Sequence, residues 1–185
     1  MTKLIILDRD GVINHDSDDY IKSPEEWHPI AGSLEAIALL CQAHYKVAVF
    51  TNQSGIARKY YTEDTLQAIH KKMLSQVGAA GGQIDKIVYC PHGPNDNCAC
   101  RKPKPGLLRQ LEKHYHMPLI GIPLIGDTKR DLEAGIPCDA YPILVKTGYG
   151  LQALQDLPDF FKKIPCFDNL LEAAKALISG TIPRT

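Results

Sequence analysis

The sequence carries no excess of charge of either sign. Lysine and arginine together number 21, as do aspartate and glutamate, so the formal net charge is zero. A chain with no net charge has no general electrostatic attraction for nucleic acid or anionic lipid, and we expect no nucleic-acid partner. Any anionic ligand must therefore be held by a local cluster of positive side chains.

A long hydrophobic run is missing from the N-terminal region. The first apolar stretch, residues 4–7, is followed directly by Asp8. This is too short for the core of a secretion signal or for a membrane span. We therefore expect a cytoplasmic protein with no membrane partner, in which thiols stay reduced. Six cysteines in such a chain indicate metal binding or core packing rather than a disulfide framework.

Internal repeats, low-complexity tracts and linker-like segments are absent as well. At 185 residues the chain is long enough for one well-buried core. We expect a single domain over residues 1–185, and a monomer.

Short apolar runs alternate with helical patterns along the chain. Continuous apolar runs suit strands that are covered on both faces, as in a parallel sheet. Strands are expected at residues 3–7, 46–50, 85–89, 122–126 and 141–145, and helices at 33–44, 62–77, 105–115 and 169–180. The predicted fold class is α/β, a doubly wound parallel sheet in one domain without a folded cap.

The expected helices carry recognisable end signals. Ser33 and Thr62 stand where N-caps are expected, and Pro105 suits a first helical position. Asn169 opens the last helix and Gly180 ends it. His70, His114 and His116 fall on helical patterns or helix ends, and we expect them on exposed polar faces.

Polar residues follow the apolar runs at the points where strands should end. Asp8, Thr51, Cys90 and Asp127 stand at four such ends. In an open parallel sheet, ligands bind outside the carboxyl ends of the strands. We therefore expect Asp8, Thr51 and Asp127 to converge on one crevice, although they lie far apart in sequence.

Four short motifs include or neighbour these positions. They are, in chain order, Asp8-x-Asp10-Gly11, Thr51, Lys102 and Gly126-Asp127-x-x-x-Asp131. Taken alone, the Asp8-x-Asp10-Gly11 motif is equally well explained as a polar turn closed by a glycine. Together, and in this order, the four motifs resemble those of the haloacid-dehalogenase (HAD) superfamily of phosphohydrolases.

The resemblance implies roles for the motif residues. Asp8 would attack phosphorus and form an aspartyl-phosphate, and Asp10 would act as general acid and then as general base. Thr51 and Lys102 would stabilise the phosphoryl oxygens, with Asp131 orienting Lys102 or the water shell of a metal.

The resemblance also implies a catalytic Mg²⁺ ion. Its implied ligands are Asp8, the backbone carbonyl of Asp10, and Asp127. Oxygen ligands of this kind select a hard cation, which offsets the repulsion between a carboxylate and a phosphate.

The segment at residues 90–100 concentrates metal-binding side chains. Cys90, His92, Cys98 and Cys100 form a set suited to structural Zn²⁺, within a loop rich in proline and asparagine. The alternatives are chance cysteines or a redox pair at Cys98 and Cys100. A zinc clamp here would fix where the next residues, Arg101 and Lys102, point.

This loop narrows the resemblance to a zinc-bearing branch of the superfamily. That branch contains phosphatases of D-glycero-D-manno-heptose 1,7-bisphosphate, acting at the 7-phosphate, and of histidinol phosphate. Ser54, residues 56–58 and residues 105–106 look more like the heptose family, which serves lipopolysaccharide or glycoprotein precursor synthesis. Histidinol phosphate stays open as the alternative substrate.

The resemblance implies a small phosphorylated sugar as the partner. Expected substrate contacts are Asp16, Tyr20, Thr51, Asn52, Gln53, Ser54, Arg101 and Lys102. The stretch from Asp16 to Tyr20 departs from the family pattern, because it is one residue longer and lacks the glycine. A second class of function, a non-catalytic zinc-binding interaction module, is disfavoured because all the motif residues are retained together.

Overall fold

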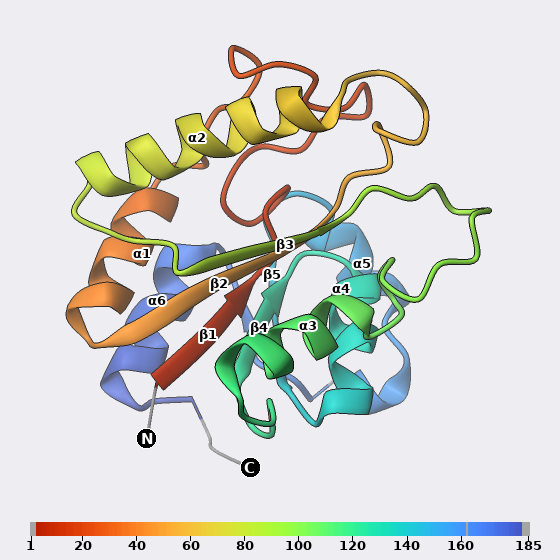
Figure 1. Cartoon of the computed structure of the whole chain (residues 1–185). Coiled ribbons are helices and arrows are strands. Elements are labelled where there is room, and N and C mark those ends of the chain that lie inside the picture. The colour runs from red at the N-terminus through yellow and green to blue at the C-terminus, as the bar shows by residue number, and fades with distance from the viewer. Residues whose placement is uncertain (1–2, 162, 183–185) are drawn as a thin grey trace.

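The computed structural model describes residues 3–161 and 163–182 and is built on one parallel sheet (Figure 1). Its six strands run in the order β3-β2-β1-β4-β5-β6. They are β1 (Lys3–Leu7), β2 (Tyr45–Asn52), β3 (Lys86–Cys90), β4 (Pro123–Gly126), β5 (Tyr141–Val145) and β6 (Cys166–Phe167). The predicted doubly wound sheet is confirmed, with the five expected strands in place and the short β6 added at the edge.

Helices cover both faces of the sheet (Figure 1). They are α1 (Ser33–Gln42), α2 (Glu63–Ala79), α3 (Gly106–Tyr115), α4 (Lys129–Gly135), α5 (Gly150–Asp156) and α6 (Leu170–Ser179). Side chains alternate along β1, so that Ile5 and Leu7 join the core under α1, α2 and α6, while Leu4 and Ile6 join the core under α3. Both faces of the strand are therefore buried, which explains its continuous apolar sequence.

Most of the predicted helix signals are confirmed. Thr62 caps α2 by accepting from the Thr65 backbone N–H at 3.2 Å. Asn169 caps α6 in the same way, and Gly180 ends that helix with a φ of 71°. The expected role of Pro105 shifts by one position, because it is the N-cap of α3 rather than its first residue.

The predicted N-cap at Ser33 is wrong. The cap residue is Gly32, and Ser33 is the first residue of α1. Gly32 has a φ of 82°, which glycine adopts more readily than residues with a side chain. The Ser33 hydroxyl instead donates to the carbonyl of Ile13 at 2.6 Å. It therefore ties the loop after β1 to the helix that follows it.

The loop between β1 and α1 lies beyond the carboxyl end of β1, beside α2 (Figure 1). Lys72 on α2 holds it there by donating to the carbonyls of Pro24 and Trp27, at 2.6 and 2.9 Å. The Trp27 ring is fully buried. This loop therefore forms one wall of the space above the sheet.

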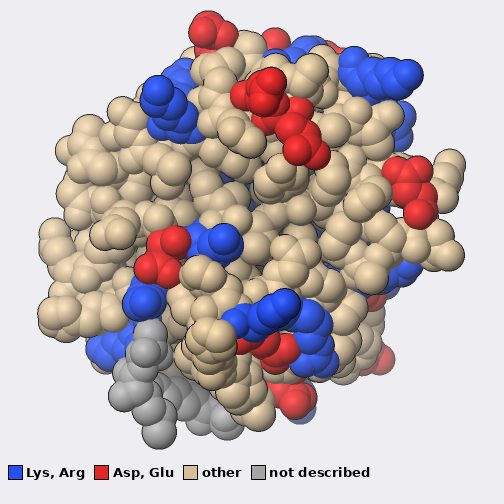
Figure 2. Space-filling view, in the orientation of Figure 1, with Lys and Arg blue, Asp and Glu red and all other residues tan. Residues whose placement is uncertain are grey.

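Charged side chains are dispersed on the face of the molecule drawn in Figure 2. Lysines and arginines lie among aspartates and glutamates there and form no continuous patch. Within residues 3–161 and 163–182, no helix combines the length and the apolar character that crossing a membrane requires.

Candidate active site

The carboxyl ends of three neighbouring strands bring the motif residues together. Asp8 follows β1, Thr51 lies at the end of β2 and Asp127 follows β4. They line one cavity of about 280 Å³, together with Asp10, Asp131 and all eight expected substrate contacts, which include Thr51 and Lys102. The predicted convergence on one crevice is thus observed in the fold.

Lys102 is the central cation of this cavity. Its side chain is 3% exposed, and its Nζ lies 2.8 Å from Asp8 Oδ1 and 2.6 Å from Asp131 Oδ1. Burial lowers the pKa of Lys102, but the two carboxylates outweigh it and hold the pKa above its usual range. The ammonium group therefore stays charged between its two partners.

Asn52 positions the backbone that carries Lys102. Its side-chain oxygen accepts from the Lys102 backbone N–H at 3.1 Å, and its Nδ2 donates to the Lys102 carbonyl at 3.3 Å. These two bonds join the end of β2 to a segment 50 residues further along the chain. Asn52 thus connects the strand end to the segment that follows the cysteine-rich loop.

Three carboxylates form a cluster that suits a metal ion. Oxygens of Asp8, Asp127 and Asp131 lie within 4.8 Å of one another. Asp127 Oδ2 accepts from the Tyr149 backbone N–H at 2.9 Å, whereas its buried Oδ1 has no hydrogen-bond partner in the described part of the chain. Burial, followed by the Asp131 charge, raises the pKa of Asp127 to about 8.

The pKa of Asp8 is raised as well, by burial first and then by Asp131. A divalent cation would offset the repulsion among the three carboxylates and would bind the Asp127 oxygen that has no hydrogen-bond partner. The residues present therefore fit a hard, oxygen-ligated metal. Gly11 allows the close packing here, because a Cβ at its position would lie 2.0 Å from Asp127 Oδ2. Its φ of +80° favours glycine as well.

Asp10 stands apart from this cluster in a network of hydrogen bonds. Arg9 holds both carboxylate oxygens of Asp10, with Nη2 at 2.9 and 3.0 Å, and Asn14 donates to Oδ1 at 2.8 Å. Burial raises the pKa of Asp10, but Arg9 and the hydrogen bonds outweigh it and hold the pKa below its usual range. The Asp10 side chain is therefore ionised in this arrangement.

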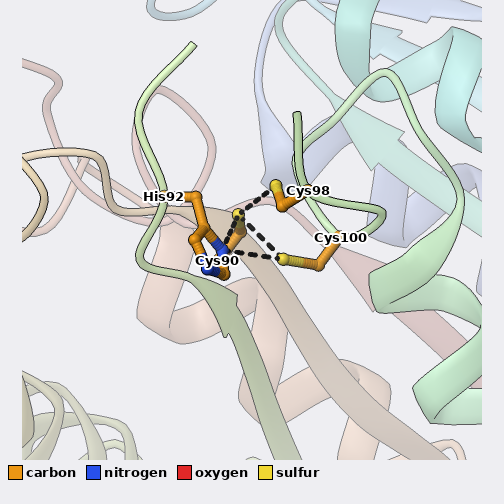
Figure 3. A group of neighbouring side chains, drawn as sticks. All are labelled: Cys90, His92, Cys98 and Cys100. Carbon is orange, nitrogen blue, oxygen red and sulfur yellow. Dashed lines mark hydrogen bonds between the residues drawn. The ribbon is translucent and has the colours of Figure 1, made fainter. Parts of the chain in front are cut away.

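The four predicted zinc ligands lie together at the end of β3. Figure 3 shows Cys90, His92, Cys98 and Cys100 pointing toward one another, with their ligand atoms within 4.8 Å. Cys90 Sγ is 3.6 Å from Cys98 Sγ and 3.0 Å from Cys100 Sγ. A tetrahedral Zn²⁺ site with zinc–sulfur bonds of 2.3 Å separates its sulfurs by about 3.8 Å, close to the longer of these distances.

Two family models match the chain. The model described as polynucleotide kinase 3 phosphatase covers residues 3–127, and the HAD-hydrolase-like model covers residues 99–173. A D-glycero-beta-D-manno-heptose-1,7-bisphosphate 7-phosphatase from Pseudomonas putida is 53% identical over 95% of this chain and 99% of the relative. The chain belongs to the heptose-bisphosphate phosphatases of the HAD superfamily.

Solved structures agree with this family assignment. The D,D-heptose 1,7-bisphosphate phosphatase from Bordetella bronchiseptica, complexed with magnesium and phosphate, superposes with a TM-score of 0.92. It is 47% identical, and the match covers 96% of this chain and 99% of that one. The resemblance inferred from the four motifs and the cysteine-rich loop is therefore confirmed.

In this heptose-bisphosphate phosphatase family member, several cavity residues were not predicted from the four motifs. Among them, Arg9, Tyr61, Arg130 and Tyr149 line the cavity. Tyr149 lies a few residues beyond the end of β5 at Val145, so the rule that placed Asp8 and Asp127 at strand ends could have identified it. Arg130 lies inside the fourth motif, between its two aspartates.

The expectation that His70 is exposed is wrong. Its side chain is buried, with its Nε2 3.3 Å from Arg9 Nη1. The sequence carried a signal for this, because His70 shares the spacing of the buried α2 residues Leu66, Met73 and Val77.

Proposed function

We propose that this protein is a phosphatase that removes the 7-phosphate of D-glycero-D-manno-heptose 1,7-bisphosphate. The observation that carries the proposal is the meeting of Asp8, Lys102 and Asp127 in one cavity, in a chain that belongs to this family. Its curated relatives are named for the beta anomer, and we propose the same preference here.

Asp8 is the proposed nucleophile. A carboxylate oxygen of Asp8 bonds to phosphorus while the bond from phosphorus to the sugar oxygen breaks, and that oxygen takes a proton from Asp10. Water then attacks the aspartyl-phosphate, Asp10 takes its proton, and the bond from Asp8 to phosphorus breaks. Ester and water are thereby converted to alcohol and inorganic phosphate, and both aspartates are restored.

Asp10 must carry a proton when the sugar oxygen leaves. Its ion pair with Arg9 opposes this before substrate binds, because that pair stabilises the carboxylate. A phosphate dianion placed beside Asp10 has the opposite effect, since a neighbouring negative charge raises a carboxyl pKa. Substrate binding therefore supplies the condition under which Asp10 can act as an acid.

Lys102 and Thr51 are the proposed partners of the phosphoryl oxygens. The Thr51 hydroxyl oxygen accepts from Gln53 Nε2 at 2.8 Å, which leaves its proton free to donate to a phosphoryl oxygen. The proposed Mg²⁺, held by Asp8, Asp127 and the Asp10 carbonyl, would offset the negative charge of the phosphate. Asp131 is proposed to hold Lys102 in place.

The second phosphate of the substrate distinguishes it from histidinol phosphate. Arg101 and Arg130 line the cavity, and guanidinium groups suit phosphate oxygens. Asp16 and Asp18 line it too, and a cationic amine such as that of histidinol phosphate would suit them. Histidinol phosphate is therefore the second candidate substrate.

The first prediction compares kcat/KM for these two substrates side by side. We expect heptose 1,7-bisphosphate to be preferred by at least about 100-fold, because charged groups left unpaired by the wrong substrate are costly. A preference for histidinol phosphate would overturn the substrate assignment and leave the phosphatase assignment standing.

We also propose that Cys90, His92, Cys98 and Cys100 hold one structural Zn²⁺. The support is their mutual approach in a loop that begins at the end of β3 and leads directly into Arg101 and Lys102. A metal in this position substitutes for the apolar packing that the loop lacks. It would fix the segment from which Lys102 enters the cavity.

The second prediction is that elemental analysis finds about one tightly held Zn²⁺ per chain, as a closed four-ligand site requires. The double variant Cys98→Ser/Cys100→Ser is expected to lose it and to unfold at a lower temperature. The matched control, Cys41→Ser/Cys166→Ser, changes two cysteines outside the cluster and should retain the metal. Metal-replete protein without zinc would contradict the proposal.

A further inference from the structure

A buried histidine outside the proposed reaction contacts the residue that holds Asp10. His70 lies on α2, and its Nε2 is 3.3 Å from Nη1 of Arg9, which is 1% exposed. Because a guanidinium can only donate, Nε2 must accept and the ring proton must sit on Nδ1. Burial, followed by the Arg9 charge, lowers the pKa of His70 to about 3, in keeping with a neutral ring.

The Arg9 guanidinium connects three elements of the fold. Its Nη1 contacts His70 on α2, its Nη2 donates to Gln53 Oε1 at 3.2 Å, and its Nε donates to Asp10 Oδ1 at 3.0 Å. Nη2 also donates to both carboxylate oxygens of Asp10, so Arg9 binds this carboxylate from one side. The position of the Asp10 carboxylate therefore depends on the residues that hold the Arg9 guanidinium.

Gln53 completes the arrangement and has no hydrogen-bonding capacity left. Its Nε2 donates to Asp10 Oδ2 at 2.9 Å and to Thr51 Oγ1 at 2.8 Å. Its Oε1 accepts from Tyr61 Oη at 2.6 Å and from Arg9. An amide offers two donor hydrogens and two acceptor lone pairs, and all four are used within the protein.

From this geometry we infer that His70 is a positioning residue that sets the place of the Asp10 carboxylate through Arg9, with Gln53 and Tyr61 as parts of the same network. Gln53 thus serves Asp10 and Thr51 rather than the sugar, which revises its expected role as a substrate contact. The inference rests on the proposed function, because it assigns the network to the residue that protonates the leaving oxygen.

The network matters because Asp10 faces the cavity. Its side chain is 18% exposed, whereas Arg9 is almost fully enclosed, so the buried partner fixes the exposed one. Removing the acceptor at His70 leaves a buried guanidinium N–H without its partner, and such a group costs free energy until it moves to another one. Any such movement of Arg9 carries Asp10 with it.

The third prediction uses the leaving group to separate positioning from general damage. In His70→Leu, kcat/KM for heptose 1,7-bisphosphate, an alkyl phosphate, is expected to fall by about 10- to 100-fold, a fraction of the roughly 10²- to 10⁴-fold that general acid catalysis supplies. With 4-nitrophenyl phosphate the fall is expected to be less than about threefold, because that leaving group departs without a proton. The ratio of the two losses is informative because kcat/KM reports the steps up to departure of the leaving group.

Two further variants sharpen the test. In His70→Gln the amide oxygen can accept near the position of Nε2, so the alkyl-ester activity should largely return. Tyr61→Phe removes the donor to Gln53 Oε1 and should show the same selective loss in a weaker form, which tests the network even where His70→Leu does not fold.

Met73→Ala is the matched control, since it opens a cavity in the core on the same face of α2 and removes none of the hydrogen bonds of the network. It should affect both substrates by the same factor. Equal losses on both substrates in His70→Leu and in Tyr61→Phe, or no loss, would overturn the inference. If the protein prefers histidinol phosphate, the loss of kcat/KM on that alkyl phosphate is compared with the loss on 4-nitrophenyl phosphate instead. A wrong substrate assignment is thereby distinguished from a wrong role for His70.

Discussion

Asp8→Asn is expected to lower phosphatase activity by about 10⁵-fold or more, the scale on which removal of a nucleophile acts in other covalent mechanisms. An amide cannot attack phosphorus at a useful rate, so no aspartyl-phosphate forms. The fold should persist, because Asp8 Oδ1 accepts from the Arg9 backbone N–H at 2.7 Å and from Lys102 at 2.8 Å, and an amide oxygen can accept both bonds. Single-turnover assays with heptose 1,7-bisphosphate measure the loss.

The same variant has a distinct expected effect on stability. The pKa of Asp8 is raised by burial and by Asp131, so its ionised form destabilises the metal-free fold at any pH above the usual carboxyl range. A neutral amide removes that penalty, and the thermal midpoint in chelator near pH 7 should equal or exceed that of the wild type. Asp156→Asn, an exposed change of the same chemistry, should leave activity and stability unchanged. Near-normal turnover in Asp8→Asn would refute the nucleophile assignment.

The strands and the motif positions were predictable because their physical causes are local. A strand covered on both faces must be apolar along its length, as residues 3–7 are, and its carboxyl end must carry whatever binds a ligand. The rule therefore placed Asp8, Thr51 and Asp127 in one cavity without any three-dimensional information. By contrast, β6 has two residues, and no periodicity can be read from so short a stretch.

The errors arose where a side chain finds a partner that is distant in sequence. Ser33 has the composition of an N-cap, but its hydroxyl bonds to Ile13, 20 residues earlier. His70 has the polarity of a surface residue, yet it is buried and contacts an arginine 61 positions away. Local propensity cannot register such contacts, and only the apolar spacing of α2 hinted at the second one.

Gln53 illustrates the limit within the site itself. Its position after a strand end correctly indicated that it lies in the cavity. Which of its atoms remain free depends on Arg9 and Tyr61, which approach it from the loop after β1 and from the segment before α2. The sequence therefore predicts where a residue stands better than it predicts what that residue touches.

Lys102→Met is expected to lower the free energy of unfolding by about 3–5 kcal/mol near pH 7, because it strands two buried carboxylates without their cation. It should also lower kcat/KM by about 10²- to 10³-fold, since a preorganised cation in the cavity is lost. Lys102 Nζ contacts both Asp8 and Asp131 within 2.8 Å, so both effects share one origin. Urea unfolding in chelator and steady-state kinetics measure them separately.

The stability deficit should depend on pH in a defined direction. Although burial raises the pKa of Asp131, Lys102 and the Thr128 hydrogen bonds outweigh it, so the pKa of Asp131 lies below its usual range. Its stabilising contribution is therefore present above the carboxyl pKa of the unfolded chain, about 4, and is lost as the pH falls through the lower folded value. The difference between Lys102→Met and the wild type should shrink over that interval.

A double variant separates stability from catalysis. Lys102→Met/Asp131→Asn removes one of the two stranded charges and should recover part of the lost free energy of unfolding, because the pair is coupled. It should recover none of the activity, since the cation that faces the phosphoryl group is still missing. Lys175→Met, which changes an exposed lysine on α6, serves as the control and should match the wild type in both assays. If Lys102→Met kept wild-type stability in chelator, Lys102 would not be the cation that balances Asp8 and Asp131.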